Sequence, residues 1–214
     1  MRLAFLLDVD NTLLDNDALK AGCDRKLRKI AGDDGAARFW AIYEEVRAAG
    51  GVIDYPETLA RFGKERPELP RPALDRAVMD APFARFVYPD ALAVIARMRE
   101  VGEVTIFSDG DPVYQPRKIA RSGLADAVRG KVLIFPHKEE HLDEVLERFA
   151  AAHYVQVDDK ASLLALTKRR LGARVTTVHV KQGHYASDPP SGSAPDLVVV
   201  RIGELLSRDF ASLG

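Results

Sequence analysis

The sequence predicts an α/β protein, with a doubly wound parallel sheet that carries an inserted helical domain. Two observations point to this class. Short apolar runs alternate with helical patterns along most of the chain, and one interval near the N-terminus has helical patterns but no convincing strand. Strands that alternate with helices are joined by right-handed crossovers and form parallel sheets. The 214 residues suffice for one such core with a smaller inserted domain.

The expected strands are six short apolar runs. Several are continuous rather than alternating, which is typical of strands covered by helices on both faces. They span Leu3–Leu7, Val104–Phe107, Val132–Phe135, Tyr154–Val157, Val175–Val180 and Leu197–Val200.

Helical patterns lie between most of these runs. The clearest is an apolar stripe from Leu142 to Phe149, whose spacing matches one face of a helix. Another helix is expected to begin at Pro89 and to end at Gly102. No strand is expected between Asp17 and Val87, where stripes such as "RFWAIYEEV" are helical. We therefore predict a sheet domain formed by residues 1–16 and 88–214, and a helical domain formed by residues 17–87.

The composition is that of an ordinary globular protein, with 47% hydrophobic and 29% charged residues. The 31 basic and 32 acidic residues leave a net charge of −1, so we expect neither nucleic acid nor a membrane as partner. The single cysteine, Cys23, excludes an intrachain disulfide and fits a reducing compartment. No apolar run reaches the roughly 18 residues that span a bilayer, and no targeting segment is recognised. We expect a cytoplasmic location.

Polar side chains follow four of the expected strands. Asp8, Asp10 and Thr12 follow the first, Ser108 the second, Lys138 the third, and Asp158 and Asp159 the fourth. The carboxyl ends of parallel strands open into one crevice, so these side chains should share a rim. Crowded, buried carboxylates repel one another, and a hard cation such as Mg2+ with oxygen ligands relieves that repulsion. A Mg2+ with a lysine and a hydroxyl nearby is a site for phosphoryl oxygens.

This ordered set resembles the haloacid dehalogenase (HAD) superfamily of hydrolases. The resemblance runs through "DVDNT", Ser108 at the end of an apolar strand, Lys138 ahead of the fourth strand, and "VDD". An Asp-x-Asp pattern alone recurs by chance, but four motifs in order are specific. The resemblance covers most of the chain outside the insertion and implies a HAD-like, Rossmann-type core. The insertion after the first motif is similar to the helical cap of many members.

The resemblance also implies roles for these residues. Asp8 would be the nucleophile that forms an aspartyl-phosphate, and Asp10 the general acid and then the base that activates water. Thr12 and Ser108 would hydrogen-bond the transferring phosphoryl group, and Lys138 would neutralise the charge on Asp8 and the phosphate. Mg2+ would bind Asp8, the main-chain carbonyl of Asp10 and a carboxylate of the fourth motif.

Two of these assignments involve a choice between neighbours. Lys131 enters the third strand at its amino end, on the wrong side of the sheet, so Lys138 is preferred. The fourth motif more commonly reads Gly-Asp in the family, where this chain has Asp158 and Asp159. Asp159 therefore aligns with the usual metal ligand, and Asp158 is expected behind it.

Several other polar or aromatic residues are expected to be structural. Asp109 and Asp111 read as turn and cap residues before a helix near Pro112, Lys160 as a surface lysine, and Trp40 as a packing residue. His184 follows the fifth strand on the correct rim, but a lone loop histidine is rarely catalytic.

The leading functional interpretation is a Mg2+-dependent phosphomonoester hydrolase acting on a small phosphorylated metabolite. A 2-haloacid dehalogenase uses the same nucleophile without metal, but those relatives replace the second acid of the first motif, which is present here as Asp10. A phosphotransferase or mutase of the superfamily stays open. A non-enzymatic alternative is a phospho-accepting signalling module, in which the acid pair comes first and the phosphorylated aspartate stands alone on a later strand. No pattern indicates the physiological substrate or the oligomeric state.

Overall fold

The computed structural model describes residues 3–51, 53–188 and 192–213 and confirms the α/β class. Within these residues, six parallel strands form one sheet in the order β3-β2-β1-β4-β5-β6. The strands are β1 (Leu3–Leu7), β2 (Gly102–Asp109), β3 (Val132–Phe135), β4 (His153–Asp158), β5 (Val175–Val180) and β6 (Leu197–Val199). The strand order reverses between β1 and β4, the point at which such sheets form their ligand-binding crevice.

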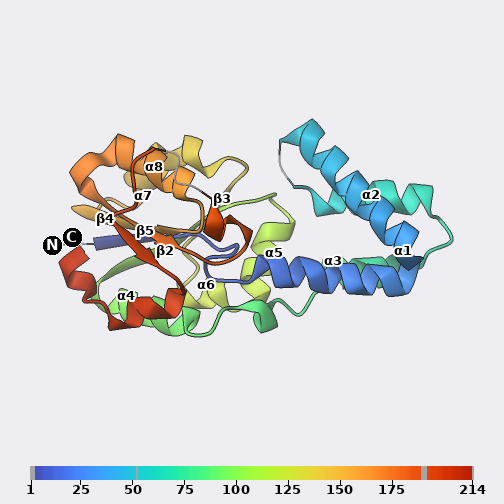
Figure 1. The fold of residues 1–214 in the computed structure, drawn as a ribbon, viewed down its shortest axis with the longest axis horizontal. Coiled ribbons are helices and arrows are strands. Elements are labelled where there is room, and N and C mark those ends of the chain that lie inside the picture. Colours follow the sequence, from blue (N-terminus) through green and yellow to red (C-terminus); the bar gives the residue numbers. More distant parts are fainter. Residues whose placement is uncertain (1–2, 52, 189–191, 214) are drawn as a thin grey trace.

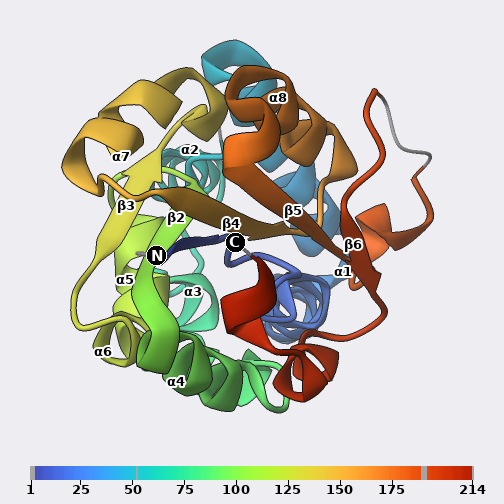
Figure 2. The ribbon, with the colours of Figure 1, turned by 90° about the vertical axis from the view of Figure 1, so that its left-hand side faces the viewer.

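Helices cover both faces of the sheet. Figure 2 shows α7 and α8 on one face and α4 on the other. The helices are α1 (Asn16–Gly50), α2 (Tyr55–Glu65), α3 (Arg71–Val78), α4 (Ala91–Val101), α5 (Tyr114–Arg121), α6 (Leu124–Ala127), α7 (Leu142–Arg148) and α8 (Ala161–Leu171). Short 3-10 turns occupy Phe83–Phe86, Lys138–His141, Gly172–Arg174, His184–Ser187, Ile202–Ser207 and Phe210–Leu213.

The central strand β1 is buried on both sides. Leu3, Phe5 and Leu7 pack into one hydrophobic cluster, together with α4 and the insertion. Ala4 and Leu6 point the opposite way, into a second cluster that includes residues of α7. Successive side chains of a strand face opposite sides of the sheet, so a strand covered twice must be apolar throughout. This explains the continuous apolar run in the sequence.

The segment between β1 and β2 is helical and lies beyond the carboxyl ends of the strands, at the right of Figure 1. Its first helix, α1, is sharply kinked at Gly32 (φ 74°, ψ 177°), so the second half turns back beside the first. Trp40 Nε1 donates a hydrogen bond across the kink to Asp24 Oδ1 (2.8 Å). Phe39 packs edge-to-face on Phe62 of α2, with ring centroids 5.5 Å apart. Trp40 is therefore a packing residue, as expected.

One predicted helix begins later than expected. The helix expected from Pro89 starts at Ala91, and Pro89 lies in a turn. Tyr88 N donates to the carbonyl of Leu13 (2.9 Å), which holds the preceding chain against the loop after β1. Asp90 then takes a left-handed conformation (φ 68°) that separates this contact from the helix. Tertiary contacts thus override the preference of proline for a helix start.

None of the helices in the described part of the chain is long and apolar enough to cross a membrane.

The kink predicts that Gly32→Ala destabilises the fold by about 1–3 kcal/mol, because this backbone region is accessible essentially only to glycine. A Cβ at Gly32 would meet no atom within 4 Å, so the loss would report backbone strain alone. Urea unfolding should show a lower midpoint with an unchanged slope. Gly50→Ala is the matched control, since Gly50 lies in the same helix, has open space around it and has no positive φ. Equal midpoints for the two variants would contradict the prediction.

Candidate active site

A cavity of about 570 Å³ opens between the strand ends and the helical insertion. The strands β2, β1 and β4 are neighbours, so residues far apart in sequence meet at their carboxyl ends. The cavity walls include Asp8, Asp10, Ser108 and Asp159 from the sheet side, and Lys20, Tyr43, Arg47 and Tyr55 from the insertion. The volume is that of a site for a small molecule.

Asp8 lies at the bottom of this cavity, directly after β1. Its backbone N–H donates to the carbonyl of Val157 (3.0 Å), which continues the sheet by one residue and fixes the side chain. Only 6% of the residue is exposed. Burial raises the pKa of Asp8 from 3.8 to about 7, even though the ammonium of Lys138 opposes the shift. The environment therefore lacks enough positive charge for a carboxylate.

Lys138 contacts Asp8 from behind rather than from the cavity. Its Nζ lies 2.6 Å from Asp8 Oδ1 and 2.7 Å from Asp158 Oδ2, and it donates to the carbonyl of Phe107 (3.3 Å). Burial acts to lower the pKa of Lys138, but the charges of Asp158 and Asp8 outweigh it and raise the pKa. Lys131 instead pairs with Glu103 near the start of β2 (3.0 Å). The structure thus brings Lys138, and not Lys131, to Asp8.

The two acids that end β4 have different surroundings. Asp158 pairs with Lys138, and its Oδ1 accepts the backbone N–H of Lys160 (2.9 Å). Asp159 lines the cavity, and both of its carboxylate oxygens are buried with no hydrogen-bond partner in the described structure. Burial, together with the charges of Asp8 and Asp158, raises the pKa of Asp159 to about 9. Asp158 therefore has the ammonium of Lys138 as its positive partner, and Asp159 has no such partner in the described structure.

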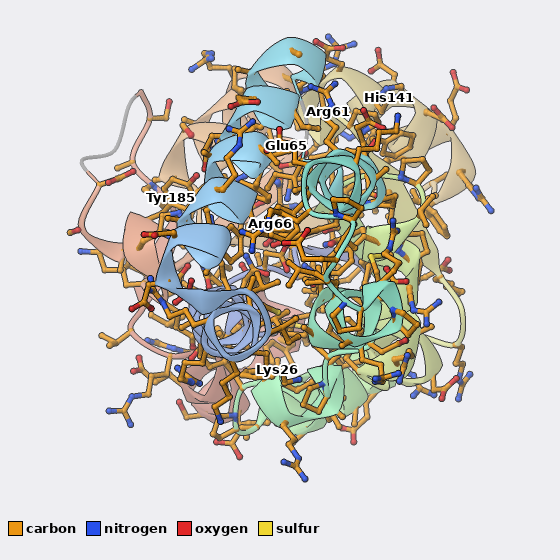
Figure 3. The ribbon with its side chains drawn as sticks, turned by 90° about the vertical axis from the view of Figure 1, so that its right-hand side faces the viewer. Lys26, Arg61, Glu65, Arg66, His141 and Tyr185 are labelled. Carbon is orange, nitrogen blue, oxygen red and sulfur yellow. The ribbon has the colours of Figure 1, made fainter. Side chains whose placement is uncertain are left out.

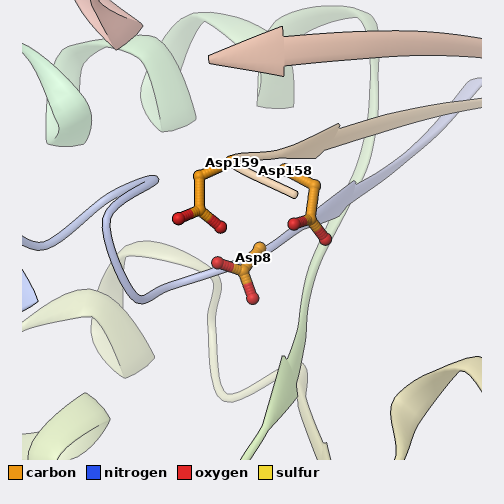
Figure 4. A group of neighbouring side chains, drawn as sticks. All are labelled: Asp8, Asp158 and Asp159. Atoms are coloured by element: carbon orange, nitrogen blue, oxygen red, sulfur yellow. The ribbon is translucent and has the colours of Figure 1, made fainter. Parts of the chain in front are cut away.

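These three acids have the chemistry of a divalent cation site. Oxygens of Asp8, Asp158 and Asp159 lie within 4.8 Å of one another, and Figure 4 shows the three carboxylates facing a common space. Carboxylates of this kind suit Mg2+, and the unpartnered oxygens of Asp159 supply ligands that no protein group satisfies. The residues present therefore fit such an ion.

Asp10 is held by residues that the sequence analysis did not single out. Lys118 Nζ lies 2.5 and 2.7 Å from its two carboxylate oxygens and 3.3 Å from Asn16 Oδ1. Gln115 Nε2 donates to Asp10 Oδ2 (3.4 Å) and to Ser108 Oγ (2.9 Å). Lys118 is only 2% exposed, although it is a charged residue. The side chain of Asp10 is directed toward α5, apart from the three-acid cluster.

The two predicted phosphoryl-binding hydroxyls differ in access. Ser108 ends up on the cavity wall, close to Asp8. Thr12 is fully buried, does not line the cavity, and its hydroxyl has no partner in the described structure. The role of Thr12 stays a prediction.

Three residues expected to be structural, Asp109, Asp111 and Lys160, line the cavity. Asp109 Oδ1 accepts the backbone N–H of Lys138 (2.9 Å), and its Oδ2 pairs with Lys160 (3.2 Å). Asp111 does cap the next helix, by accepting the N–H groups of Val113 and Tyr114 (2.9 and 2.7 Å). The prediction of Asp109 as a turn residue was wrong, because Asp109 is the last residue of β2, and Lys160, expected at the surface, is half-buried in its ion pair with Asp109. His184 also lines the cavity, paired with Asp17 (2.7 Å).

One solved structure is similar to the whole chain. It is a haloacid dehalogenase-like hydrolase from Burkholderia xenovorans LB400, 44% identical over 100% of this chain and 99% of that chain, with a TM-score of 0.90. The chain belongs to the haloacid dehalogenase-like hydrolases. No family model and no curated protein matches it.

More distant members share the fold of this haloacid dehalogenase-like hydrolase. The HAD-hydrolase YfnB from Bacillus subtilis, bound to magnesium, is 17% identical over 95% of this chain and 96% of its own, with a TM-score of 0.63. The L-2-haloacid dehalogenase from Xanthobacter autotrophicus, with chloropropionic acid covalently bound, is 20% identical over 96% and 97%, with a TM-score of 0.58. At these identities the likeness concerns the fold alone.

The unpaired charge of Asp159 predicts that this HAD-like hydrolase becomes less stable as the pH rises when Mg2+ is absent. The pKa of Asp159 is about 9 in the folded protein against an ordinary value of 3.8, so between these values the folded state holds a proton that the unfolded state has lost. The free energy of unfolding must then fall across this window. Millimolar Mg2+ should remove most of the fall, because it binds only the native site.

Urea unfolding at about pH 5, 7 and 9, with EDTA or with Mg2+, measures this effect. Asp159→Asn should flatten the pH dependence and abolish the response to Mg2+. Asp158→Asn is the matched control and should destabilise at every pH, because it leaves Lys138 with less compensation. The same pH slope in wild type with and without Mg2+ would refute the metal assignment.

Proposed function

We propose that this protein is a phosphomonoester hydrolase that acts on a small phosphorylated metabolite through an aspartyl-phosphate at Asp8, with Mg2+ as cofactor. The observation that carries the proposal is the second acid, Asp10, on the wall of the same cavity. Its side chain is 34% exposed, against 8% for Asp8. A leaving alkoxide needs a proton, which a carboxyl group beside the nucleophile supplies. A leaving halide needs none.

The proposed reaction has two displacements at phosphorus. In the first, a carboxylate oxygen of Asp8 bonds to phosphorus, the bond to the leaving oxygen breaks, and Asp10 transfers its proton to that oxygen. In the second, a water oxygen attacks the same phosphorus while Asp10 takes a proton from the water. The bond between Asp8 and phosphorus breaks, which releases inorganic phosphate and restores both acids.

Other residues at the rim fit supporting parts in this reaction. Lys138, 2.6 Å from Asp8 Oδ1, fixes the nucleophile and offsets its charge. The hydroxyl of Ser108 accepts from Gln115 and donates to the carbonyl of Asp109 (3.1 Å), and it would donate to a phosphoryl oxygen by turning its proton to the cavity. Thr12 would need to turn its hydroxyl toward the cavity to act as a second donor. Mg2+, held by Asp8, Asp159 and the main-chain carbonyl of Asp10, would neutralise the charge of the phosphoryl oxygens when bound.

We infer that residues 17–87 act as a cap over a sheet domain formed by residues 1–16 and 88–214. The support is the composition of the cavity wall, in which Tyr43 and Tyr55 of the insertion lie across from Asp8. A wall shared in this way closes around a substrate when the two parts approach, which excludes water from the reactive phosphoryl group.

Hydrolysis of a 2-haloacid is the second candidate. The observation in its favour is the full-length fold likeness to a haloacid dehalogenase with chloropropionic acid covalently bound. In this chemistry Asp8 would displace the halide from carbon, and water would then cleave the resulting ester. A carboxylate at the rim could activate that water, but a halide leaves without a proton, so the reaction does not use Asp10 as an acid, which is why we rank it second.

The first test is product analysis. We expect phosphate release from p-nitrophenyl phosphate with Mg2+, its loss with EDTA, and a fall to background in Asp8→Asn, since the amide is nearly the same shape but a poor nucleophile. Halide release from 2-chloropropionate is measured in parallel. Halide release without phosphate release would overturn the proposal in favour of dehalogenation, and full phosphatase activity in Asp8→Asn would exclude covalent catalysis by this residue.

The role of Asp10 predicts a dependence on the leaving group. Asp10→Asn should slow hydrolysis of an alkyl phosphate by about 10²–10⁴-fold, because an alkoxide leaves poorly without a proton. The first displacement on p-nitrophenyl phosphate should slow much less, since nitrophenolate is stable as an anion. Single-turnover release of nitrophenol separates this step from the water attack, for which Asp10 is also needed. Equal losses for both leaving groups in this step would contradict the assignment.

A further inference from the structure

Lys20 differs from the other lysines of the cavity wall because, among the described residues, no carboxylate lies within ion-pair distance of its ammonium. Lys118 pairs with Asp10 and Lys160 with Asp109. In the part of the chain that the structure describes, no ion pair or hydrogen bond involves the Nζ of Lys20. The ammonium of Lys20, with three N–H donors, therefore lines the same cavity as the nucleophile.

The position of Lys20 is fixed by two aromatic rings. Its Nζ lies 4.9 Å from the ring centroid of Trp40 and 4.4 Å from that of Tyr43, both on the second half of α1. Trp40 is anchored by its hydrogen bond to Asp24, and Tyr43 packs on Tyr55 with centroids 5.3 Å apart. The kink of α1 is what brings Lys20 from the first half against these rings. The ammonium is thus held over a rigid platform.

Arg47 adds a second positive charge to the same wall. It is exposed, and its own acidic neighbour, Glu44, is 3.6 Å away. Burial lowers the pKa of Lys20, and Arg47 adds to that shift while Glu44 and Asp17 oppose it. Two like charges close enough to affect each other are relieved by an anion between them.

Part of the cavity wall is aromatic. Tyr55 and Tyr114 both line the cavity, with ring centroids 4.3 Å apart. A ligand that fills the cavity would therefore have the nucleophile, aromatic rings and the two cations on the walls around it.

We propose that Lys20 and Arg47 bind a second anionic group of the substrate, a carboxylate or a second phosphoryl group, at the end away from the phosphate that is hydrolysed. The inference rests on the proposed phosphatase function and names its substrate class: phosphomonoesters with a second negative charge. Lys26 and Arg66 of the insertion do not take this position, since neither lines the cavity. Figure 3 shows both from the side of the insertion.

The test compares three esters of one chain length: butyl phosphate, 3-carboxypropyl phosphate and butane-1,4-diyl bisphosphate. In wild type, kcat/KM should be at least about 10-fold higher for the two esters with a second anion, as expected for charge-assisted hydrogen bonds. Lys20→Met, which keeps the length of the side chain over the rings, should reduce that ratio toward one, mainly through KM. Lys20→Arg should restore part of it. Lys26→Met, on an exposed part of the same helix, is the control and should change neither value.

The two anion-bearing esters separate the possible sources. A preference for the carboxylate alone or for the bisphosphate alone identifies which anion is bound, and either supports the proposal. Equal kcat/KM for all three esters in wild type would overturn it, as would the same ratio in wild type and Lys20→Met.

A binding measurement keeps this inference separate from the proposed function. Trp40 is the only tryptophan, so its fluorescence reports directly on the platform beneath Lys20. In Asp8→Asn, 3-carboxypropyl phosphate should change the fluorescence of Trp40 more strongly than butyl phosphate, and Lys20→Met should abolish the difference. This result without any phosphate release by wild type would retain the anion site and reject the phosphatase. Phosphate release with no such difference would retain the phosphatase and reject the anion site.

Discussion

The cost of burying negative charge beside Asp8 is the constraint on which this molecule depends. Three carboxylates, those of Asp8, Asp158 and Asp159, converge where β1 and β4 end, and Lys138 is the ammonium within ion-pair distance of them in the described structure. An uncompensated buried charge costs several kcal/mol. The sheet nevertheless holds these acids together, because β1 and β4 are adjacent parallel strands in register. Such a cluster has the charge and the oxygen ligands for the Mg2+ that we propose.

The rest of the rim pairs its charges one by one. Lys118 lies against Asp10, Lys160 against Asp109, and His184 against Asp17. These pairs hold the acids apart from the three-acid cluster, so Asp10 keeps a position of its own on the cavity wall. In the proposed reaction one acid attacks and another exchanges protons. Two acids with different roles need different environments, and here they have different ion-pair partners.

The sequence was sufficient where structure depends on local pattern. All six strands were predicted within two residues at either end, since each is a short apolar run, and Lys138 followed from the polarity of parallel strands. The sequence was insufficient where contacts join distant elements. Lys118 lies 108 positions from Asp10 in the sequence. It is buried, although it is charged, because α5 packs on the loop after β1. The sequence contained one signal of this contact. Gln115 and Lys118 are three positions apart on the helix after the second motif, so they share one face of that helix.

The contribution of α1 to the cavity wall depends on the backbone conformation of one residue. Gly32 reverses the direction of α1, so that one helix contributes Lys20 from its first half and Trp40 and Tyr43 from its second. A straight helix of 35 residues would extend about 50 Å from the sheet and would separate these residues. The reversal instead returns the second half to the cavity, where Arg47 and Tyr43 lie opposite the strand ends. In the proposed function, recognition of the far end of a substrate would thus depend on the geometry of one kink, and the reacting end on the register of the sheet.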